Sequence, residues 1–308
     1  MDKENLNEEE YLKKHLSSID NQKNNEVQKT ESTSKVNTLT KDLEFFHYNV
    51  DELPCGIFYP KGSKFMIRAA SVKEIQAYSM VDESNFYDVI EKINNILQNC
   101  ARIKYPDGSV GSYLDIKDQD RIYLIFCIRE LTFQAGNNLS VSHKCSCGEE
   151  VNIPLLRHNF KFYDINPKLE KYFSASTRSF IFNLKSGHTY EMTPPNIGIQ
   201  RAFTDYILKE TNEKRPPNMA FLKIIPFMLV GSNSISYEGI QAKLKEFEKL
   251  SNDDFQFLNS AVSMMTFGIS ELKKTCGCGE EVHTEMQFPN GVSAIFVIHD
   301  AFDTFIKE

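Results

Sequence analysis

The sequence CSCGEE at residues 145–150 returns as CGCGEE at residues 276–281. Each copy has two cysteines one residue apart, then a glycine and two glutamates, and each leads into a strand-like run, VNIPL or VHTEM. An apolar, helix-like stretch that ends in Thr-Phe, at 132–133 or 266–267, precedes each copy. The pattern predicts two related halves, each a helix followed by a β-hairpin with cysteines in its turn.

These turns predict one structural zinc site that joins the two halves as a zinc-ribbon-like pair of knuckles. Zinc is bound by four soft or borderline ligands in a tetrahedron, and two turns with two thiolates each would supply them. The predicted ligands are Cys145, Cys147, Cys276 and Cys278.

The spacing leaves alternatives open. The usual knuckle has two residues between its cysteines, and here there is one. His143 and His283 flank the turns and are alternative ligands, and the cysteine pairs could also carry no metal. An iron–sulfur cluster is disfavoured because nothing else in the sequence indicates electron transfer.

The composition narrows the class of protein. The chain has 308 residues, 41% of them apolar and 25% charged, as in ordinary soluble proteins. A net charge of −7 disfavours sequence-independent nucleic-acid binding, which needs a basic face. No apolar run reaches the ~18 residues expected of a membrane span. The polar start is unlike a signal peptide, so we expect the seven cysteines to lie in a reducing compartment, where metal sites are commoner than disulfides.

We expect an α+β fold with a disordered tail at 1–44, an N-terminal half at 45–156 and a C-terminal half at 157–308. The tail is rich in Asn, Lys, Glu and Ser, with one amphipathic patch at Tyr11, Leu12, Leu16 and Ile19 that would fold on a partner.

Local patterns predict several elements. A strand is expected at 64–70, and Ser71 should cap a helix with Glu74 at capping-box spacing. Ser84 should cap the next helix, whose apolar face begins at Phe86, and a buried helix is expected at 115–133. Further expected elements are a hairpin at 179–192, a helix from 197, an apolar helix at 219–230 kinked or split at Pro226, and helices at 237–250 and 252–267.

Motifs for chemistry are missing. The sequence has no phosphate-binding glycine loop, no H-E-x-x-H and no G-x-S-x-G. Cys55, Cys100 and Cys127 are expected to act as small core hydrophobes. We therefore expect a protein that is not an enzyme.

The apolar C-terminal stretch is expected to form part of a permanent subunit contact, because no single helix or strand face buries all of its residues. The alternative is that it packs inside its own chain. The residues concerned are Ile295, Phe296, Val297, Ile298, Phe302 and Phe305.

The order of these segments resembles the baseplate hub proteins of T-even-like contractile-tailed bacteriophages. The likeness rests on LPCGIFYP at 53–60, on MIRAASVKEI at 66–75, and on a helix with Asp115 or Asp120, Leu124 and Arg129 before the first H-x-C-x-C-G turn. It is best over about residues 50–155 and weaker beyond. This chain departs from the family pattern in having Cys55 where serine is usual and in the shorter knuckles.

The resemblance implies a structural virion protein of the tail baseplate, made in the host cytoplasm, that holds neighbouring tail proteins together. It leaves open a symmetric ring of identical copies, and it implies neither nucleic acid nor membrane as a partner. One alternative is a hub assembly chaperone that is absent from the mature virion. The other is a zinc-ribbon nucleic-acid-binding protein.

The tail provides the first test. A chain that begins at Phe45 should melt at nearly the full-length temperature, because residues 1–40 offer little apolar surface to a core. The same truncation should fail to enter particles. Aggregation of the truncated chain, or a loss of several degrees in calorimetry, would show that the tail belongs to the fold.

Overall fold

The computed structural model describes residues 44–133, 139–288 and 291–297. All of them belong to one compact unit, and their buried apolar side chains form a single cluster from Val50 to Phe296. The fold is a mixture of helices and antiparallel sheets, as expected, with the four knuckle cysteines close together. The relation between two halves remains a prediction, and the predicted tail lies outside the described residues except for Glu44.

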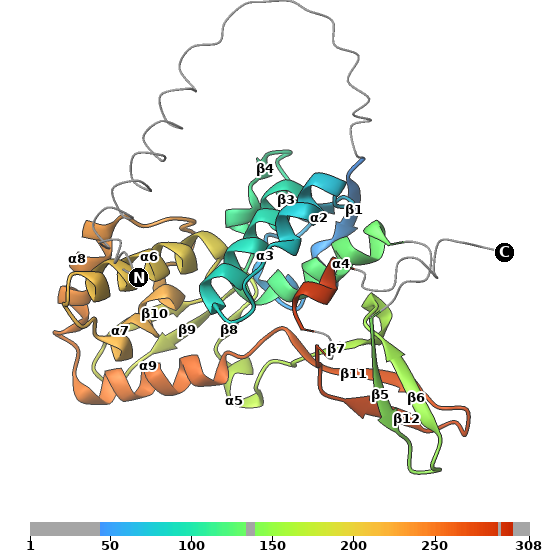
Figure 1. Cartoon of the computed structure of the whole chain (residues 1–308). Helices are drawn as coiled ribbons and strands as arrows, with labels where there is room; N and C mark the ends of the chain where they lie inside the picture. Colours follow the sequence, from blue (N-terminus) through green and yellow to red (C-terminus); the bar gives the residue numbers. More distant parts are fainter. Residues whose placement is uncertain (1–43, 134–138, 289–290, 298–308) are drawn as a thin grey trace, which may run out of the picture. The chain divides into compact units, whose positions relative to one another are not determined.

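The first part of the chain builds an antiparallel sheet in the order β1-β2-β3-β4, next to three helices (Figure 1). Phe65 and Ile103 are opposite each other in this sheet and are fully buried. The strands are β1 (Phe46–Asn49), β2 (Lys64–Ile67), β3 (Ala101–Lys104) and β4 (Val110–Gly111). The helices are α2 (Val72–Ser79), α3 (Phe86–Cys100) and α4 (Arg121–Thr132).

A second group of elements surrounds a three-stranded antiparallel sheet in the order β10-β9-β8. Pro226 splits the expected apolar helix into α7 and a 3-10 turn at Ile225–Met228, because proline lacks the N–H that would continue the helix. The strands are β8 (Phe173–Ser174), β9 (Ser179–Asn183) and β10 (Thr189–Met192). The helices are α5 (Pro167–Glu170), α6 (Ile197–Asn212), α7 (Met219–Leu222), α8 (Tyr237–Phe247) and α9 (Asn252–Met264).

Two hairpins lie side by side away from these groups (Figure 1). One is β5 (Ser140–Lys144) with β6 (Glu150–Pro154), and the other is β11 (Ile269–Thr275) with β12 (Glu281–Thr284). Strand β11 also pairs with β7 (Phe160–Phe162), which ties the second hairpin to the chain that leaves the first.

Most helix starts follow the sequence, but two differ. The helix expected at 115–133 begins at Arg121, after 3-10 turns at Tyr113–Asp115 and Asp118–Asp120, and α3 has another cap than expected. Ser71 and Glu74 form the expected capping box of α2. The cap of α3 is Asn85 rather than Ser84, since the Asn85 side chain accepts from the backbone of Tyr87 and Asp88. Ser84 instead donates to Asp82 in the preceding turn.

Buried thiols and aromatic rings fill the core. Cys55, Cys100 and Cys127 are buried, which confirms the expectation that they are core residues. Phe58 connects the two sheet groups, because its ring contacts Phe180 at 5.6 Å and Phe267 at 5.0 Å between centroids.

The first part of the C-terminal stretch corrects the subunit-contact prediction. Ile295 and Phe296 are 0% and 1% exposed, and the Phe296 ring packs against Tyr78 at 5.1 Å. These two residues therefore belong to the core of their own chain, as the alternative had it. Ile298, Phe302 and Phe305 lie outside the described residues.

A buried carboxylate joins the segments that carry the family resemblance. Asp120 is fully buried and accepts from the backbone N–H of Cys55 at 2.7 Å and from the Tyr59 hydroxyl at 2.6 Å. The Tyr59 oxygen accepts in turn from the backbone N–H of Lys117 at 2.7 Å. The LPCGIFYP segment is thus fixed to the start of α4 by one side chain.

Burial has a measurable electrostatic consequence. It raises the pKa of Asp120 to about 6, although the hydrogen bonds from Tyr59 and Cys55 oppose the shift. A folded-state pKa above the unfolded value stabilises the protein at low pH, and that contribution is lost as pH rises through about 6.

Within the described residues, no helix combines the length and apolarity needed to cross a membrane.

The Asp120 carboxylate predicts a difference in pH dependence. Between pH 7 and pH 4 the wild type should gain about 2 kcal/mol of unfolding free energy relative to Asp120→Asn, whose amide does not titrate. Urea unfolding of both proteins across this range measures the difference, which removes the acid effects common to both.

An exposed residue without a titratable group provides the control. Met80→Ser, at a position 77% exposed, should leave the wild-type pH profile in place. Parallel curves for the wild type and Asp120→Asn would contradict the raised pKa.

Candidate metal centre

The two cysteine turns have the same backbone geometry. In the first, the N–H of Cys145 donates to the carbonyl of Glu149 at 2.8 Å and that of Gly148 to Cys145 at 2.9 Å. In the second, Cys276 donates to Glu280 at 2.8 Å and Gly279 to Cys276 at 2.9 Å. The local repeat seen in the sequence is therefore a structural repeat at the knuckles.

Each turn requires glycine for a steric reason. Gly148 and Gly279 have φ angles of 93° and 92°, in the left-handed region where a Cβ atom is strained. The turn brings each cysteine pair to the end of its hairpin, on the side that meets the other hairpin. Thus the Cys-x-Cys-Gly order produces the local fold.

The four predicted ligands come together. The Sγ atoms of Cys145 and Cys278 are 3.7 Å apart, and so are those of Cys147 and Cys276. All four sulfurs lie within 4.8 Å of one another. Cys145 and Cys276 are buried, and Cys147 and Cys278 are exposed. The arrangement is compatible with one metal ion bound between the hairpins, and the one-residue spacing does not prevent it.

The distances between the sulfur atoms also show whether the cysteines are paired in disulfides. A disulfide needs about 2.05 Å between sulfurs, and all seven cysteines are free in this structure. A hydrogen bond to the backbone of Glu280 lowers the pKa of Cys278, helped by the neighbouring cysteines. This favours the thiolate form that metal binding requires at Cys278. At Cys145 and Cys276 a backbone hydrogen bond to each sulfur opposes the change, but burial and neighbouring side chains raise the pKa.

The histidines beside the turns are not part of the cluster. His283 directs Nδ1 to Glu271 and Nε2 to Glu281, each at 3.1 Å, and lies on β12. His143 is exposed on β5, opposite Val151. Among the described residues, the cluster of potential metal ligands is made of the four cysteines alone.

Two glutamates, each directly after the glycine of its turn, cross between the hairpins. The carboxylate of Glu149 lies 3.3 Å from the Cys276 sulfur, and that of Glu280 lies 3.4 Å from the Cys145 sulfur. Ser146 also donates to Glu280. The repeated Glu after each glycine was the available signal, because equivalent positions in paired turns make equivalent contacts.

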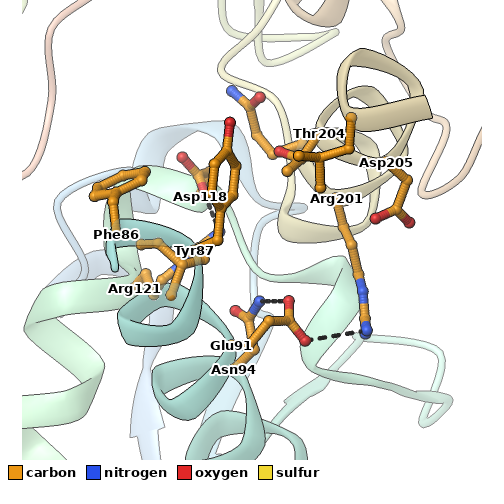
Figure 2. A pocket seen from close by; sticks show the side chains of 12 residues that line it. Phe86, Tyr87, Glu91, Asn94, Asp118, Arg121, Arg201, Thr204 and Asp205 are labelled. Atoms are coloured by element: carbon orange, nitrogen blue, oxygen red, sulfur yellow. Dashed lines mark hydrogen bonds and ion pairs between the residues drawn. The ribbon is translucent and has the colours of Figure 1, made fainter. Parts of the chain in front are cut away.

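A second feature is a groove of about 410 Å³ between α3 and α6 (Figure 2). Figure 2 shows Phe86 and Tyr87 on one side and Arg201, Thr204 and Asp205 on the other. Phe86 is 71% exposed and Tyr87 is 47% exposed. The expected apolar face of α3 thus faces the core only from its second turn onward, since the described chain places no core element over its first turn.

The floor of this groove is polar. Asn94 is 2% exposed, and its amide donates to Glu91 at 3.1 Å, while Glu91 also accepts from Arg201 at 3.2 Å. Arg121 pairs with Asp118, which also lines the groove. Within the described part of the chain, Asn94 Oδ1 and Arg121 Nε have no hydrogen-bond partner. Exposed aromatic rings over such a floor offer a binding surface for another protein.

Comparisons with known proteins give no relative for this chain. No protein-family model, no curated protein and no solved structure matches it.

The metal centre predicts the effect of removing one ligand. Cys276→Ser should lower metal binding and unfolding free energy together, because a metal ion bound by the four cysteines would link positions 129 to 133 residues apart. A cross-link over ~100 residues stabilises by roughly 4–5 kcal/mol in the chain-entropy estimate for disulfides, and we expect a loss of that order. Elemental analysis and chelator-dependent melting measure the two quantities.

The chain offers a matched control. Cys100→Ser removes a buried thiol outside the cluster and should keep the metal content. Undiminished metal in Cys276→Ser would sink the assignment of this residue as a ligand.

Proposed function

We propose that this protein is a structural subunit of a bacteriophage tail baseplate hub, held in shape by a four-cysteine zinc ion, that joins neighbouring tail proteins. The closed arrangement of the four sulfurs carries the structural part of the proposal, and the assignment to a baseplate hub rests on the resemblance. It supports a site that shapes a protein rather than one that acts on a substrate.

The spacing of the sulfurs supports zinc. Zinc–sulfur bonds of about 2.3 Å in a tetrahedron put neighbouring sulfurs about 3.8 Å apart. The two measured pairs, at 3.7 Å each, agree with this value. Four thiolates would fill the zinc coordination sphere, so no position would be left for water or substrate. We therefore propose a structural ion and no enzymatic activity.

The buried contacts of Asp120 support the family resemblance. The resemblance was drawn from separate stretches, LPCGIFYP and the start of the long helix, and these stretches meet through Cys55, Tyr59 and Asp120. Segments that share one buried hydrogen-bond network have a physical reason to occur together in a sequence. This supports the proposal. The assignment to the family rests on the resemblance alone, because the comparisons found no relative.

The lysines near the knuckles argue against the nucleic-acid alternative. Lys273 pairs with Glu281 at 3.8 Å, and Lys274 donates to the carbonyl of Asn152 at 2.7 Å. Glu149 and Glu280 reach toward the sulfurs of the same surface. A phosphate backbone would meet carboxylates there.

Mass spectrometry of purified virions tests the proposal. A structural subunit stays in the particle at a fixed copy number, and the assembly-chaperone alternative predicts its absence from mature virions. A protein that is found in neither virions nor assembly intermediates would overturn both.

The groove between α3 and α6 predicts a specific assembly defect. Replacing Phe86 and Tyr87 together by serine should change the unfolding free energy by no more than about 0.5 kcal/mol, because both rings are largely exposed. The number of copies in particles should fall at least about tenfold, because aromatic anchors dominate the energy of protein contacts.

Exposed apolar residues elsewhere give the control. Met80→Ser and Val110→Ser, at positions 77% and 56% exposed, should leave incorporation near the wild-type level. Wild-type copy number in the Phe86/Tyr87 variant would exclude this groove as the contact.

A further inference from the structure

A pocket of about 390 Å³ lies where the segment after Phe58 meets the loops at 193–196 and 229–233. Lys117 and Arg178 bring two positive charges to its wall. We propose that this pocket binds the C-terminal carboxylate of another polypeptide.

Lys117 is positioned by the protein but has donor capacity left. Its ammonium donates to the carbonyl of Pro194 at 2.8 Å and contacts the Thr193 hydroxyl at 3.2 Å. An ammonium group has three N–H bonds, so one remains for a ligand. Burial lowers the pKa of Lys117 to about 8, against the opposing effect of Cys55 and Asp120, so the protein itself compensates this charge incompletely.

Arg178 has a backbone conformation that is more favourable for glycine. Its φ angle is 55°, in the left-handed region, between β8 and β9. Glycine takes this conformation with less strain, so arginine costs backbone energy here. One guanidinium nitrogen donates to the carbonyl of Ile57 at 3.0 Å, which directs the side chain to the pocket. A guanidinium has five N–H bonds, and the others can serve an anion.

The charges in the pocket are unbalanced. Among the described residues, neither Lys117 nor Arg178 has a carboxylate at ion-pair distance. The one carboxylate in the lining, Asp115, accepts from the backbone of Ser112 at 2.7 Å and from the Asn233 amide at 3.0 Å. Within the lining, two cations and one carboxylate leave one positive charge, and partly buried charge is costly without a partner. The Asp120 carboxylate also acts on Lys117, but it lies outside the lining and its oxygens are bound to Tyr59 and Cys55.

This balance selects the ligand. One carboxylate would match the excess positive charge of the lining groups, whereas a phosphate dianion would exceed it and would meet Asp115. The remaining wall includes Phe58, Pro60, Pro195 and Leu229, which suit an apolar residue next to the carboxylate. The chemistry fits the end of a polypeptide. A carboxylate site goes beyond the proposed function. Its binding can be tested on purified protein without any phage component.

Calorimetric titration of the full chain at low salt gives the direct test. The probe is the peptide acetyl-Ala-Leu-Phe with a free C-terminal carboxylate, compared with the same peptide as a C-terminal amide and with inorganic phosphate. The acid should bind at least about tenfold more tightly than the amide, as expected for hydrogen bonds to a charged group. Phosphate should bind more weakly than the acid.

Three variants assign the site. Lys117→Gln keeps a donor for Pro194 and removes the charge, and Arg178→Gly removes the guanidinium while relieving backbone strain. Each should weaken binding of the acid about tenfold and bring it near the amide. Lys214→Gly is the control, because Lys214 is exposed, has a φ angle of 57° and lies outside the pocket lining. It should bind like the wild type.

Several results would overturn the proposal. They are equal binding of acid and amide, no binding of the acid, tighter binding of phosphate, or unchanged binding in Lys117→Gln. If Arg178→Gly fails to fold, the comparison of Lys117→Gln with Lys214→Gly still decides the question.

Discussion

Four sulfur atoms lie within 4.8 Å of one another between two hairpins that the chain forms more than a hundred residues apart. A metal ion bound to them would close a loop that includes β7 to β10 and α5 to α9. Strand β11 also pairs with β7, so backbone hydrogen bonds position the second hairpin. Metal binding would add to this pairing by lowering the chain entropy of the unfolded state. A site of this kind gives shape, and it leaves recognition to other surfaces.

A second constraint on the fold is the buried carboxylate of Asp120. Asp120 binds the backbone of Cys55 and the hydroxyl of Tyr59, and it begins the helix α4 that crosses the core. The segment that it fixes carries Phe58 into the aromatic contact between the sheets and forms one wall of the Lys117/Arg178 pocket. The aromatic packing around Phe58 and the wall of the proposed carboxylate pocket therefore depend on the same buried carboxylate.

Local signals in the sequence were enough to predict the knuckles, the Ser71 capping box, the hairpin of β9 and β10 and the split at Pro226. Each depends on neighbouring residues, such as the glycine that a left-handed turn requires. The environment of Asp120 and the exposure of Phe86 depend on which distant segments meet, and periodicity does not contain that information. Phe86 continues the apolar stripe of α3, and only the tertiary fold shows that nothing described covers it. The subunit contact expected at Ile295 and Phe296 was wrong for the same reason, since adjacent apolar residues can be enclosed by several elements of their own chain.

X-ray absorption at the zinc edge of the purified protein is the most direct test of the central claim. The account predicts one zinc per chain, with a first shell of four sulfurs at about 2.3 Å and no nitrogen or oxygen ligand. Protein that is folded but binds no zinc, or a shell that contains imidazole or water in place of sulfur, would contradict it.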